Sequence, residues 1–314
     1  MRTYHDYYKS AREIYGRQRP DIQMQRDVYG LTIAEVHSEK PNAFVQPPAE
    51  YRALVASLAE RIAARLDANH AVLAEPKDAG SGFAQKLSAI WDLPELEALG
   101  ASVVPQLEET LFGSFAYISA VHIYRSLVTA EPPKASWLWH YDNNPLEVIK
   151  FLIYLTDCDS ESGAFEYICE PGTGKGVKIA SSRTGFDHWT KPLFEGSRVP
   201  EPVIQDYLQQ GYEIRRVVGP AGTGILFDNN CIHRATVPKW RHRDAMVLLL
   251  RPVDRPIRPF ISRTYTGSWI HKEPVVDPDL LTPVPKEAGF AAGQARSAVV
   301  ARQPGVHARA HGNE

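Results

Sequence analysis

The sequence predicts a mainly β fold, a sandwich or barrel, with helices flanking it. Two observations carry this prediction: apolar residues recur at helical spacing in the first hundred residues, and short strand-like runs follow from about residue 115. An order of helices first and strands later differs from the alternating pattern of doubly wound nucleotide-binding folds. A composition of 44% hydrophobic and 23% charged residues is ordinary for a globular domain.

Residues 1–114 form the part that is expected to be mainly helical. One helix is predicted where apolar residues repeat every three or four positions, and Pro47 and Pro48 mark its start. Its apolar positions are Leu54, Val55, Leu58, Ile62 and Leu66. A second, short helix is predicted from Pro105 to Phe112, ending at Gly113.

Residues 115–255 are expected to form the β core, because the runs there are rich in β-branched and aromatic residues and are separated by turn residues. The predicted strands are 116–124, 148–155, 164–168, 213–218, 224–227 and 245–250. Residues 177–212 interrupt them as an insertion with a helix from Pro200 to Gln210, ended by Gly211. This insertion could be a lid over the site or an ordinary surface loop, and the sequence favours neither interpretation. Residues 285–314 are predicted to be a disordered tail, which leaves 1–284 as a single domain.

Charge and cysteine usage exclude several classes of protein. The chain has 35 basic and 37 acidic residues, a formal charge of -2, so it offers no general field for nucleic acid or an acidic membrane. No apolar run has the length of a membrane span, and the N-terminus lacks an apolar signal core. Three cysteines without a C-x-x-C pair do not suit a thiolate zinc knuckle and fit a reducing, cytoplasmic setting. The expected partner is a small-molecule substrate, and the sequence does not indicate the oligomeric state.

Three residues carry the functional prediction. His140 and Asp142 lie two apart, so that in an extended segment both side chains point to one side. His233 follows a glycine-rich turn and a strand-like run. Two imidazoles and one carboxylate can occupy one face of an octahedral ferrous ion and leave the other face open. His140 alone would be read as a core histidine beside tryptophans, and Asp228, a second carboxylate near His233, is expected to cap a turn.

The surroundings of these residues resemble the phytanoyl-CoA hydroxylase-like family of Fe(II)/2-oxoglutarate oxygenases over roughly residues 115–255. The matching features, in order, are His140-Tyr141-Asp142, then Tyr154-Leu155-Thr156-Asp157 with Gly163, then Glu170-Pro171-Gly172-Thr173-Gly174, then Gly224, His233 and Arg243. One departure is Gly174, which stands where the family usually has a histidine that does not bind the metal. The resemblance implies a double-stranded β-helix core, the jelly roll or cupin-like fold.

The same resemblance implies the chemistry. His140, Asp142 and His233 would bind Fe(II), with 2-oxoglutarate as cosubstrate and O2 as oxidant. A C–H bond of a small organic substrate would be hydroxylated or otherwise oxidised, with release of succinate and CO2, and the presence of Asp142 argues against halogenation. Arg243 is the preferred partner of the far carboxylate of 2-oxoglutarate, because a guanidinium can grip a carboxylate with two bonds. Arg241 and Arg251 stay open as alternatives.

Further residues are weaker candidates. Tyr154 or Thr156 could hydrogen-bond the cosubstrate. Residues near the predicted substrate mouth are Tyr124, Arg125, Trp137, Asn143, Asn144 and Trp189. Lys150, inside an apolar run, would be unusual unless it is paired or faces a polar pocket, and a mixed sheet face with one edge in water is an open alternative. The alternatives are a non-catalytic metal-binding β-sandwich protein and a Zn(II) hydrolase, for which no H-E-x-x-H motif is present.

Overall fold

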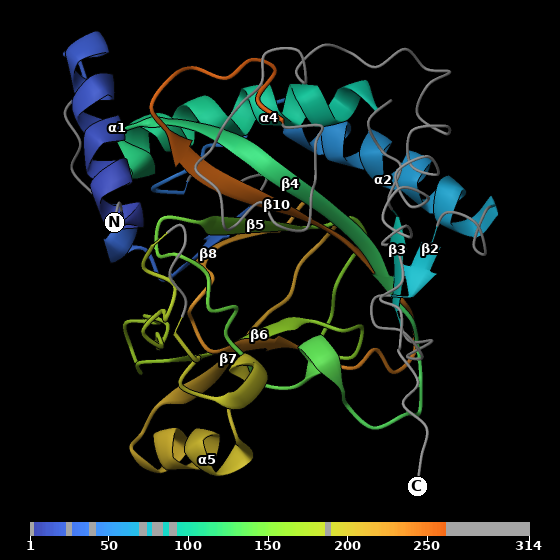
Figure 1. Ribbon diagram of the computed structural model, residues 1–314. Coiled ribbons are helices and arrows are strands. Elements are labelled where there is room, and N and C mark those ends of the chain that lie inside the picture. The colour runs from blue at the N-terminus through green and yellow to red at the C-terminus, as the bar shows by residue number, and fades with distance from the viewer. Residues whose placement is uncertain are drawn as a thin grey trace, which may run out of the picture. The chain divides into compact units, whose positions relative to one another are not determined.

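Figure 1 shows the computed structural model of the chain. The chain divides into two compact units, Met1–Leu281 and Thr282–Glu314, and every residue that the structure describes belongs to the first unit. The described residues are 3–22, 27–37, 42–68, 74–76, 84–87, 93–185 and 190–261. The predicted tail 285–314 and Trp189 lie outside them.

A large antiparallel sheet forms the centre of the described unit. Its seven strands have the order β1-β8-β5-β10-β4-β3-β2. The strands that sequence analysis anticipated in this sheet are β4 (Phe115–Ser126), β5 (Ile149–Tyr154), β8 (Gly224–Asp228) and β10 (Arg243–Val253). Three strands come from the part expected to be mainly helical: β1 (Ile33–Val36), β2 (Ala74–Pro76) and β3 (Ala84–Leu87). They extend both sides of the sheet, a contribution that their short and weakly alternating sequences did not indicate.

A smaller sheet faces the large one. Its order is β7-β6-β9, from β6 (Phe165–Cys169), β7 (Glu213–Val217) and β9 (His233–Ala235). Two isolated bridges continue it, because His140 pairs with His233 on one side and with Arg198 on the other. The chain therefore alternates between the sheets. In sequence, the His140 segment of the small sheet lies between β4 and β5 of the large sheet.

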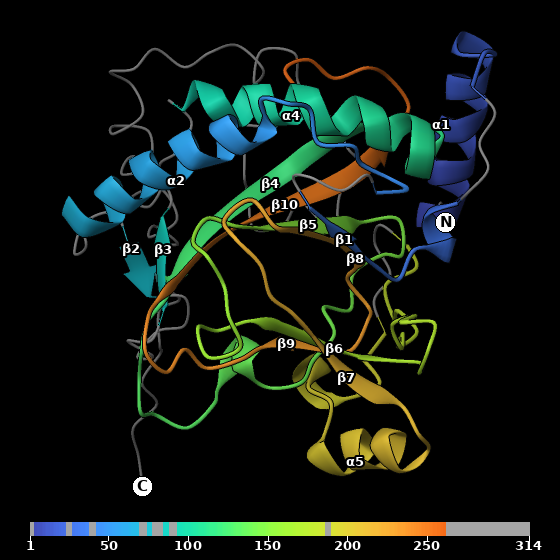
Figure 2. The same cartoon turned by 180° about the vertical axis from the view of Figure 1, so that it is seen from behind.

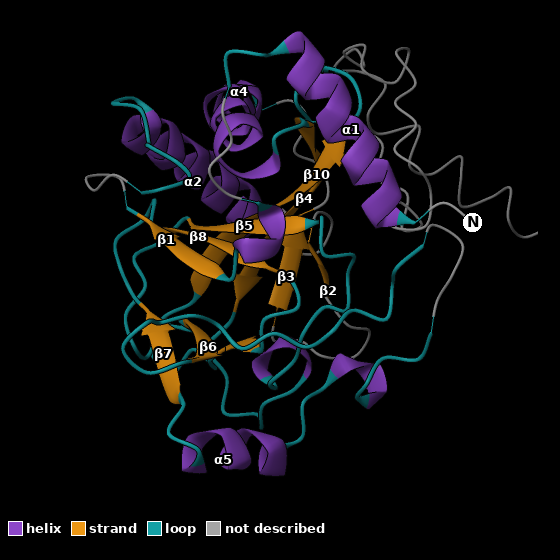
Figure 3. Cartoon of the chain, turned by 90° about the vertical axis from the view of Figure 1, so that its left-hand side faces the viewer, coloured by secondary structure: helices purple, strands orange, loops and turns teal. Residues whose placement is uncertain are grey.

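Helices cover the outer side of each sheet (Figures 2 and 3). The helices α2 (Tyr51–Ala68) and α4 (Pro94–Leu107) lie over the large sheet, while α1 (Tyr4–Gln18) stands beside them. The helix α5 (Glu201–Gln209) lies on the far side of the small sheet. Short 3-10 turns occur at Val28–Gly30, Ala135–Trp137 and Glu195–Ser197. The predicted helices around residues 54–66 and 200–210 are confirmed, and Gly211 ends the latter with φ +91°.

The helix predicted to begin at Pro105 is wrong in its start. α4 begins at Pro94, and Pro105 lies inside it. Buried apolar residues continue at helical spacing through the proline, which outweighs the lost hydrogen bond of its ring nitrogen: Leu96, Leu99, Val103 and Leu107. A π-helical turn, Glu108–Phe112, follows, and Gly113 in the left-handed region (φ +56°) ends it as predicted.

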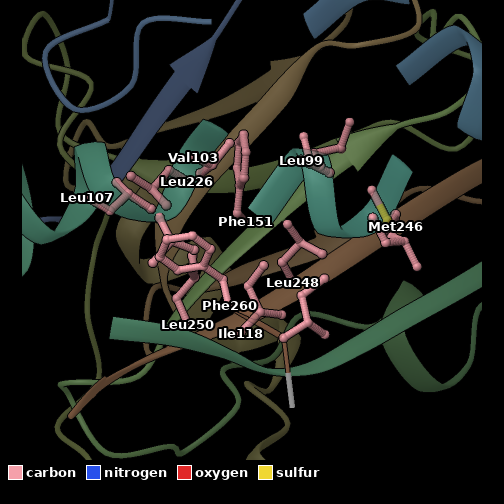
Figure 4. Close-up of a cluster of buried hydrophobic side chains, with 14 of the residues drawn as sticks. Leu99, Val103, Leu107, Ile118, Phe151, Leu226, Met246, Leu248, Leu250 and Phe260 are labelled. Carbon is pink, nitrogen blue, oxygen red and sulfur yellow. The ribbon is translucent and has the colours of Figure 1, made fainter. Parts of the chain in front are cut away.

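The main hydrophobic core fills the space between the large sheet and its covering helices. Figure 4 shows Leu99, Val103 and Leu107 of α4 pointing at side chains of the sheet. On β10 the even-numbered residues Met246 and Leu248 face this core, and the odd-numbered ones face the small sheet. This alternation is what a strand with two covered faces requires. None of the helices in the described part of the chain combines the length and the apolar character that a membrane crossing needs.

A buried ion pair fixes the start of β10. The Arg125 guanidinium donates to both carboxylate oxygens of Asp244, at 2.7 and 2.8 Å, and also contacts the more exposed Asp67. Asp244 is 1% exposed. We expect Arg125→Met to lower the free energy of unfolding by roughly 3–5 kcal/mol, because it leaves a buried carboxylate unpaired.

Urea denaturation of the variant and of Lys239→Met measures this effect. Lys239 pairs with Glu161 at the surface, where both side chains are at least half exposed, so its replacement should cost less than about 1 kcal/mol. Equal losses for the two variants would contradict the structural weight given to Arg125.

Candidate metal centre

Three side chains converge between the two sheets. One ligand atom each from His140, Asp142 and His233 lies within 4.8 Å of the others, the only such His/Cys/Asp/Glu group found among the described residues. The two imidazole rings are 4.3 Å apart between centroids, and Nε2 of His233 is 3.7 Å from Oδ2 of Asp142. The structure thus brings together the three residues on which the sequence prediction depends.

Backbone pairing sets this geometry. The N–H groups of His140 and His233 each donate to the carbonyl of the other residue, at 3.0 and 2.9 Å. Side chains directly opposite in an antiparallel pair lie on the same face, so both imidazoles point towards the large sheet. The N–H of Asp142 donates to the Asn229 carbonyl at 2.9 Å, which anchors the third candidate ligand to the turn that precedes His233.

Each histidine has a fixed tautomer. Nδ1 of His140 lies 2.8 Å from the Leu138 carbonyl, and Nδ1 of His233 lies 2.8 Å from the Cys231 carbonyl. A carbonyl oxygen can only accept, so Nδ1 carries the proton and the Nε2 lone pair remains available as a metal ligand. Both acceptors are carbonyls of the residue two positions earlier, and these hydrogen bonds hold each ring in place.

The environment keeps both imidazoles neutral. Burial lowers the pKa of His233 to about 4, and burial together with the neighbouring His233 lowers the pKa of His140 well below its ordinary value. Rings from both sheets enclose His233, with Phe165 at 5.3 Å and Phe227 at 5.1 Å between centroids. Metal binding requires neutral imidazole, so the site is prepared for a cation at neutral pH.

Lys150 is the paired lysine that the sequence allowed for. Its ammonium donates to Oδ2 of Asp142 at 2.6 Å. Burial by itself would raise the pKa of Asp142, but Lys150 and the two imidazoles outweigh it and hold the pKa well below its ordinary value. The carboxylate is therefore ionised, and Lys150 fixes one of its two oxygens.

Arg243 is buried between the sheets at the start of β10. It is 1% exposed, and its guanidinium contacts the Gly163 carbonyl and lies 3.5 Å from the Ser126 hydroxyl. The rings of Tyr124 and Tyr154 are 5.9 and 5.8 Å from its central carbon. Its Nε is buried without a hydrogen-bond partner. A buried cation with an unsatisfied donor, and without a carboxylate partner among the described residues, suits an anionic ligand.

The two alternatives to Arg243 occupy other settings. Arg241 stacks on Trp240 and lies 3.4 Å from Asp159, in a part-exposed pair. Arg251 lies eight residues further along β10, beside Tyr117. Arg251 is therefore far from the start of β10, and Arg241, two residues before Arg243, is more exposed and already has a carboxylate partner.

Thr156 and Tyr154, the two predicted partners of the cosubstrate, have different hydrogen-bond environments. The Thr156 hydroxyl accepts the N–H of Asp244, the residue after Arg243, which leaves its own hydrogen to donate. The Tyr154 hydroxyl donates to the Val217 carbonyl and accepts the N–H of Phe165. It thus ties the large sheet to the small one, and a cosubstrate hydrogen bond from Tyr154 is not available without breaking that tie.

We expect Tyr154→Phe to cost about 1–3 kcal/mol of unfolding free energy, because two buried backbone groups lose their partner. Its affinity for 2-oxoglutarate should stay close to that of the unaltered protein. Urea denaturation and a 2-oxoglutarate titration measure the two quantities, with Tyr207→Phe on α5 as the matched control. A loss of affinity without a loss of stability would restore the role that sequence analysis gave to Tyr154.

Most residues predicted at the substrate mouth hold the structure instead. Arg125 faces away from Tyr124 and pairs with Asp244, so its predicted substrate role is corrected. The Asn143 side chain makes three hydrogen bonds to Ser182 in the insertion, the shortest 2.7 Å long. The carbonyl of Asn144 accepts from Asn230. Trp137 is 2% exposed.

Asp228 and Gly174 also have structural roles. Asp228 accepts the N–H of Asn230 at 2.8 Å and pairs with Lys178 at 2.8 Å, so it caps a turn as predicted and does not join the metal ligands. Gly174 has φ +67°, and a Cβ there would lie 2.1 Å from the guanidinium of Arg215. The arginine is flexible and could move, but the positive φ is a backbone conformation that residues with a Cβ rarely adopt, so glycine suits this position.

The insertion packs on the outer face of the small sheet. Apolar residues of its segment around α5 cluster with Trp139 and Tyr141, whose side chains point away from the metal ligands. A cavity of about 650 Å³ lies there, lined among others by Trp137, Trp139, Leu193, Phe194, Arg198 and Arg234, and by none of the three metal ligands. In its described part the insertion therefore supports the strand that carries His140.

Several solved structures are similar to this chain. EctD from S. alaskensis with 2-oxoglutarate and 5-hydroxyectoine is 16% identical over 80% of this chain and 83% of its own, with a TM-score of 0.49. The α-ketoglutarate-dependent carbocyclase SnoK from nogalamycin biosynthesis is 16% identical over 80% and 90%, with a TM-score of 0.46. HygX from Streptomyces hygroscopicus with nickel, 2-oxoglutarate and hygromycin B is 11% identical over 72% and 85%, at 0.44. No family model and no curated protein sequence matches the chain.

Proposed function

We propose that this protein is an Fe(II)/2-oxoglutarate-dependent oxygenase that hydroxylates, or otherwise oxidises, an unactivated C–H bond of a small organic substrate. The observation that carries the proposal is the His140, Asp142 and His233 cluster, with both Nε2 atoms free of backbone bonds. Two imidazoles and one carboxylate on one side of a cation are the donor set typical of non-haem iron oxygenases.

The strand order supports the matching fold. We infer a double-stranded β-helix of the phytanoyl-CoA hydroxylase-like kind, because the chain alternates between facing sheets of order β8-β5-β10-β4 and β7-β6-β9. The metal ligands lie on the small sheet and on the segment that pairs with its β9 strand. Arg243 enters the same space from the large sheet.

The residues present fit the metal and the cosubstrate. His140 and His233 would bind iron through Nε2, and Asp142 through its carboxylate, to which Lys150 also donates. Arg243, with its unsatisfied Nε, would bind the far carboxylate of 2-oxoglutarate, and Thr156 can donate beside it. Phe165 and Phe227 exclude water from one side of His233. When bound, iron and 2-oxoglutarate supply the oxidising chemistry, with succinate and CO2 as by-products.

Anaerobic addition of 2-oxoglutarate to the Fe(II)-loaded protein tests the proposal. A bidentate oxo acid on ferrous iron gives a weak visible charge-transfer band, which a Zn(II) hydrolase or a structural metal site would not give. We expect the band with Fe(II), no band with Zn(II), and succinate release once oxygen is admitted. An iron-loaded protein without the band would contradict the proposal and favour the structural or hydrolytic alternative.

A further inference from the structure

We propose that Lys150 is a positioning residue that competes with a divalent cation for Asp142, so that metal uptake replaces an internal ion pair. The inference rests on the proposed function, because it concerns how the same site takes up its metal. It also goes beyond that function, because the set of three ligands does not by itself say which charge balances the carboxylate before a metal binds.

One carboxylate oxygen of Asp142 faces both the lysine and a metal ligand. Nζ of Lys150 donates to Oδ2 at 2.6 Å, and Nε2 of His233 is 3.7 Å from the same Oδ2. The bond that supports a metal ligand normally uses an atom that does not face the metal, as Nδ1 of each histidine does here. Lys150 bonds instead to the oxygen on the His233 side, where the ammonium and a cation held by His233 would compete.

The strand β5 directs Lys150 into the space between the two sheets. Lys150 lies opposite Leu249 of β10 and Phe227 of β8 in the antiparallel registers, and both of these side chains belong to the apolar cluster between the sheets. Directly opposite side chains share a face, so Lys150 enters this space from the large sheet. Its Nζ is 6.0 Å from the centroid of the Phe227 ring, which lies 5.1 Å from the ring of His233.

The ion pair lies largely out of water. The side chains of Lys150 and Asp142 are 18% and 19% exposed, and in the described part of the chain Asp142 is the carboxylate with which Lys150 pairs. Separating two such charges is unfavourable unless each gains another partner. A divalent cation would supply that partner to Asp142, and it would repel the ammonium, with little screening by salt where water is scarce.

Repulsion outweighs orientation in this arrangement. Lys150 helps to orient the Asp142 carboxylate, and an orienting bond by itself would strengthen metal binding. The backbone of Asp142, however, is fixed without the lysine, by its N–H bond to the Asn229 carbonyl at 2.9 Å. Only the side-chain torsions of Asp142 depend on Lys150, and a bound cation would fix these torsions itself. The net effect of Lys150 is therefore to lower the metal affinity of the site.

Titration with Co(II) tests the competition, because the visible absorption of this ion reports binding without turnover. Lys150→Gln keeps an N–H donor but loses the charge, and it should bind Co(II) roughly tenfold more tightly than the unaltered protein. Lys150→Arg keeps the charge and should show no gain in affinity. Lys178→Gln is the matched control, because Lys178 forms a similar pair with Asp228, at 2.8 Å, outside the metal-ligand group. It should leave the Co(II) affinity unaltered.

Urea denaturation with EDTA or with saturating Co(II) separates this role from an ordinary structural one. In EDTA, Lys150→Gln should unfold at a lower urea concentration than the unaltered protein, because Asp142 has lost its cation. Saturating Co(II) should remove this deficit, because the metal takes the place of the ammonium. Lys178→Gln should keep its deficit in both conditions. A Lys150→Gln protein that folds only when Co(II) is added would show the same effect in a stronger form.

The outcomes separate the two proposals. Equal or weaker Co(II) binding by Lys150→Gln would overturn the competition, and so would a stability deficit that Co(II) does not remove. Either result leaves the oxygenase proposal standing if the Fe(II)–2-oxoglutarate band forms in the unaltered protein. Failure of the unaltered protein to bind Co(II) and Fe(II) would overturn both.

Discussion

Asp142→Ala should abolish 2-oxoglutarate turnover and weaken Fe(II) binding by at least about 100-fold. The variant loses one of three ligands, and it also leaves the Lys150 ammonium, now 2.6 Å from the carboxylate, without its partner. That positive charge would then face the two imidazoles and repel a divalent cation. Anaerobic metal titration and succinate release measure the two effects.

Asp228→Asn is the matched control for this variant. Asp228 is also a buried carboxylate with a lysine partner, Lys178, but it lies outside the metal-ligand group. The control should keep the metal affinity of the unaltered protein, although its stability falls. Succinate release by a folded Asp142→Ala protein at the unaltered rate would contradict the proposed function.

Arg243→Ala should weaken 2-oxoglutarate binding by roughly 100-fold, the loss of about 3 kcal/mol expected when a buried two-pronged charge contact is removed. Metal affinity should stay close to normal, because none of the metal ligands contacts Arg243 in the described part of the chain. The charge-transfer band, titrated with 2-oxoglutarate at saturating Fe(II), reports the change.

Two further variants sharpen the result. Arg243→Lys keeps the charge but not the fork geometry and should recover only part of the affinity. Arg241 lies two residues before Arg243, and its part-exposed guanidinium pairs with Asp159. Arg241→Ala should therefore leave the affinity for 2-oxoglutarate unaltered. If Arg241→Ala lowers the affinity and Arg243→Ala does not, the role passes to Arg241.

Local pattern was sufficient for most of the strands and for two helices. β5 and β10 are predicted well because runs of β-branched and apolar residues specify strands covered on both faces. The start of α4 was missed because a proline normally marks a helix start, whereas tertiary burial of Leu99 and Val103 outweighs Pro105. β1 was missed because it has only four residues, and its own sequence carries no clear strand pattern. It becomes a strand by pairing with β8, a contact between distant parts of the chain.

The residues of the candidate site also differ in whether their role could be predicted from local sequence. The spacing of His140 and Asp142 is a local property, so the sequence could indicate two candidate metal ligands and, with the family pattern, a third. The structural partners of Arg125 and Tyr154, which are Asp244 and Phe165, could not be predicted because they are distant in sequence.

The sequence by itself determined the fold class, the three metal-ligand candidates and a preferred arginine, because periodicity and short-range spacing are written in consecutive residues. Only the tertiary structure decided which nitrogen of each histidine faces the site, that Lys150 holds Asp142, and which cations surround the ligands. The physical reason is that hydrogen-bond partners and charges act through space at a few ångströms. Residues that lie that close are here as far apart in sequence as His140 and His233.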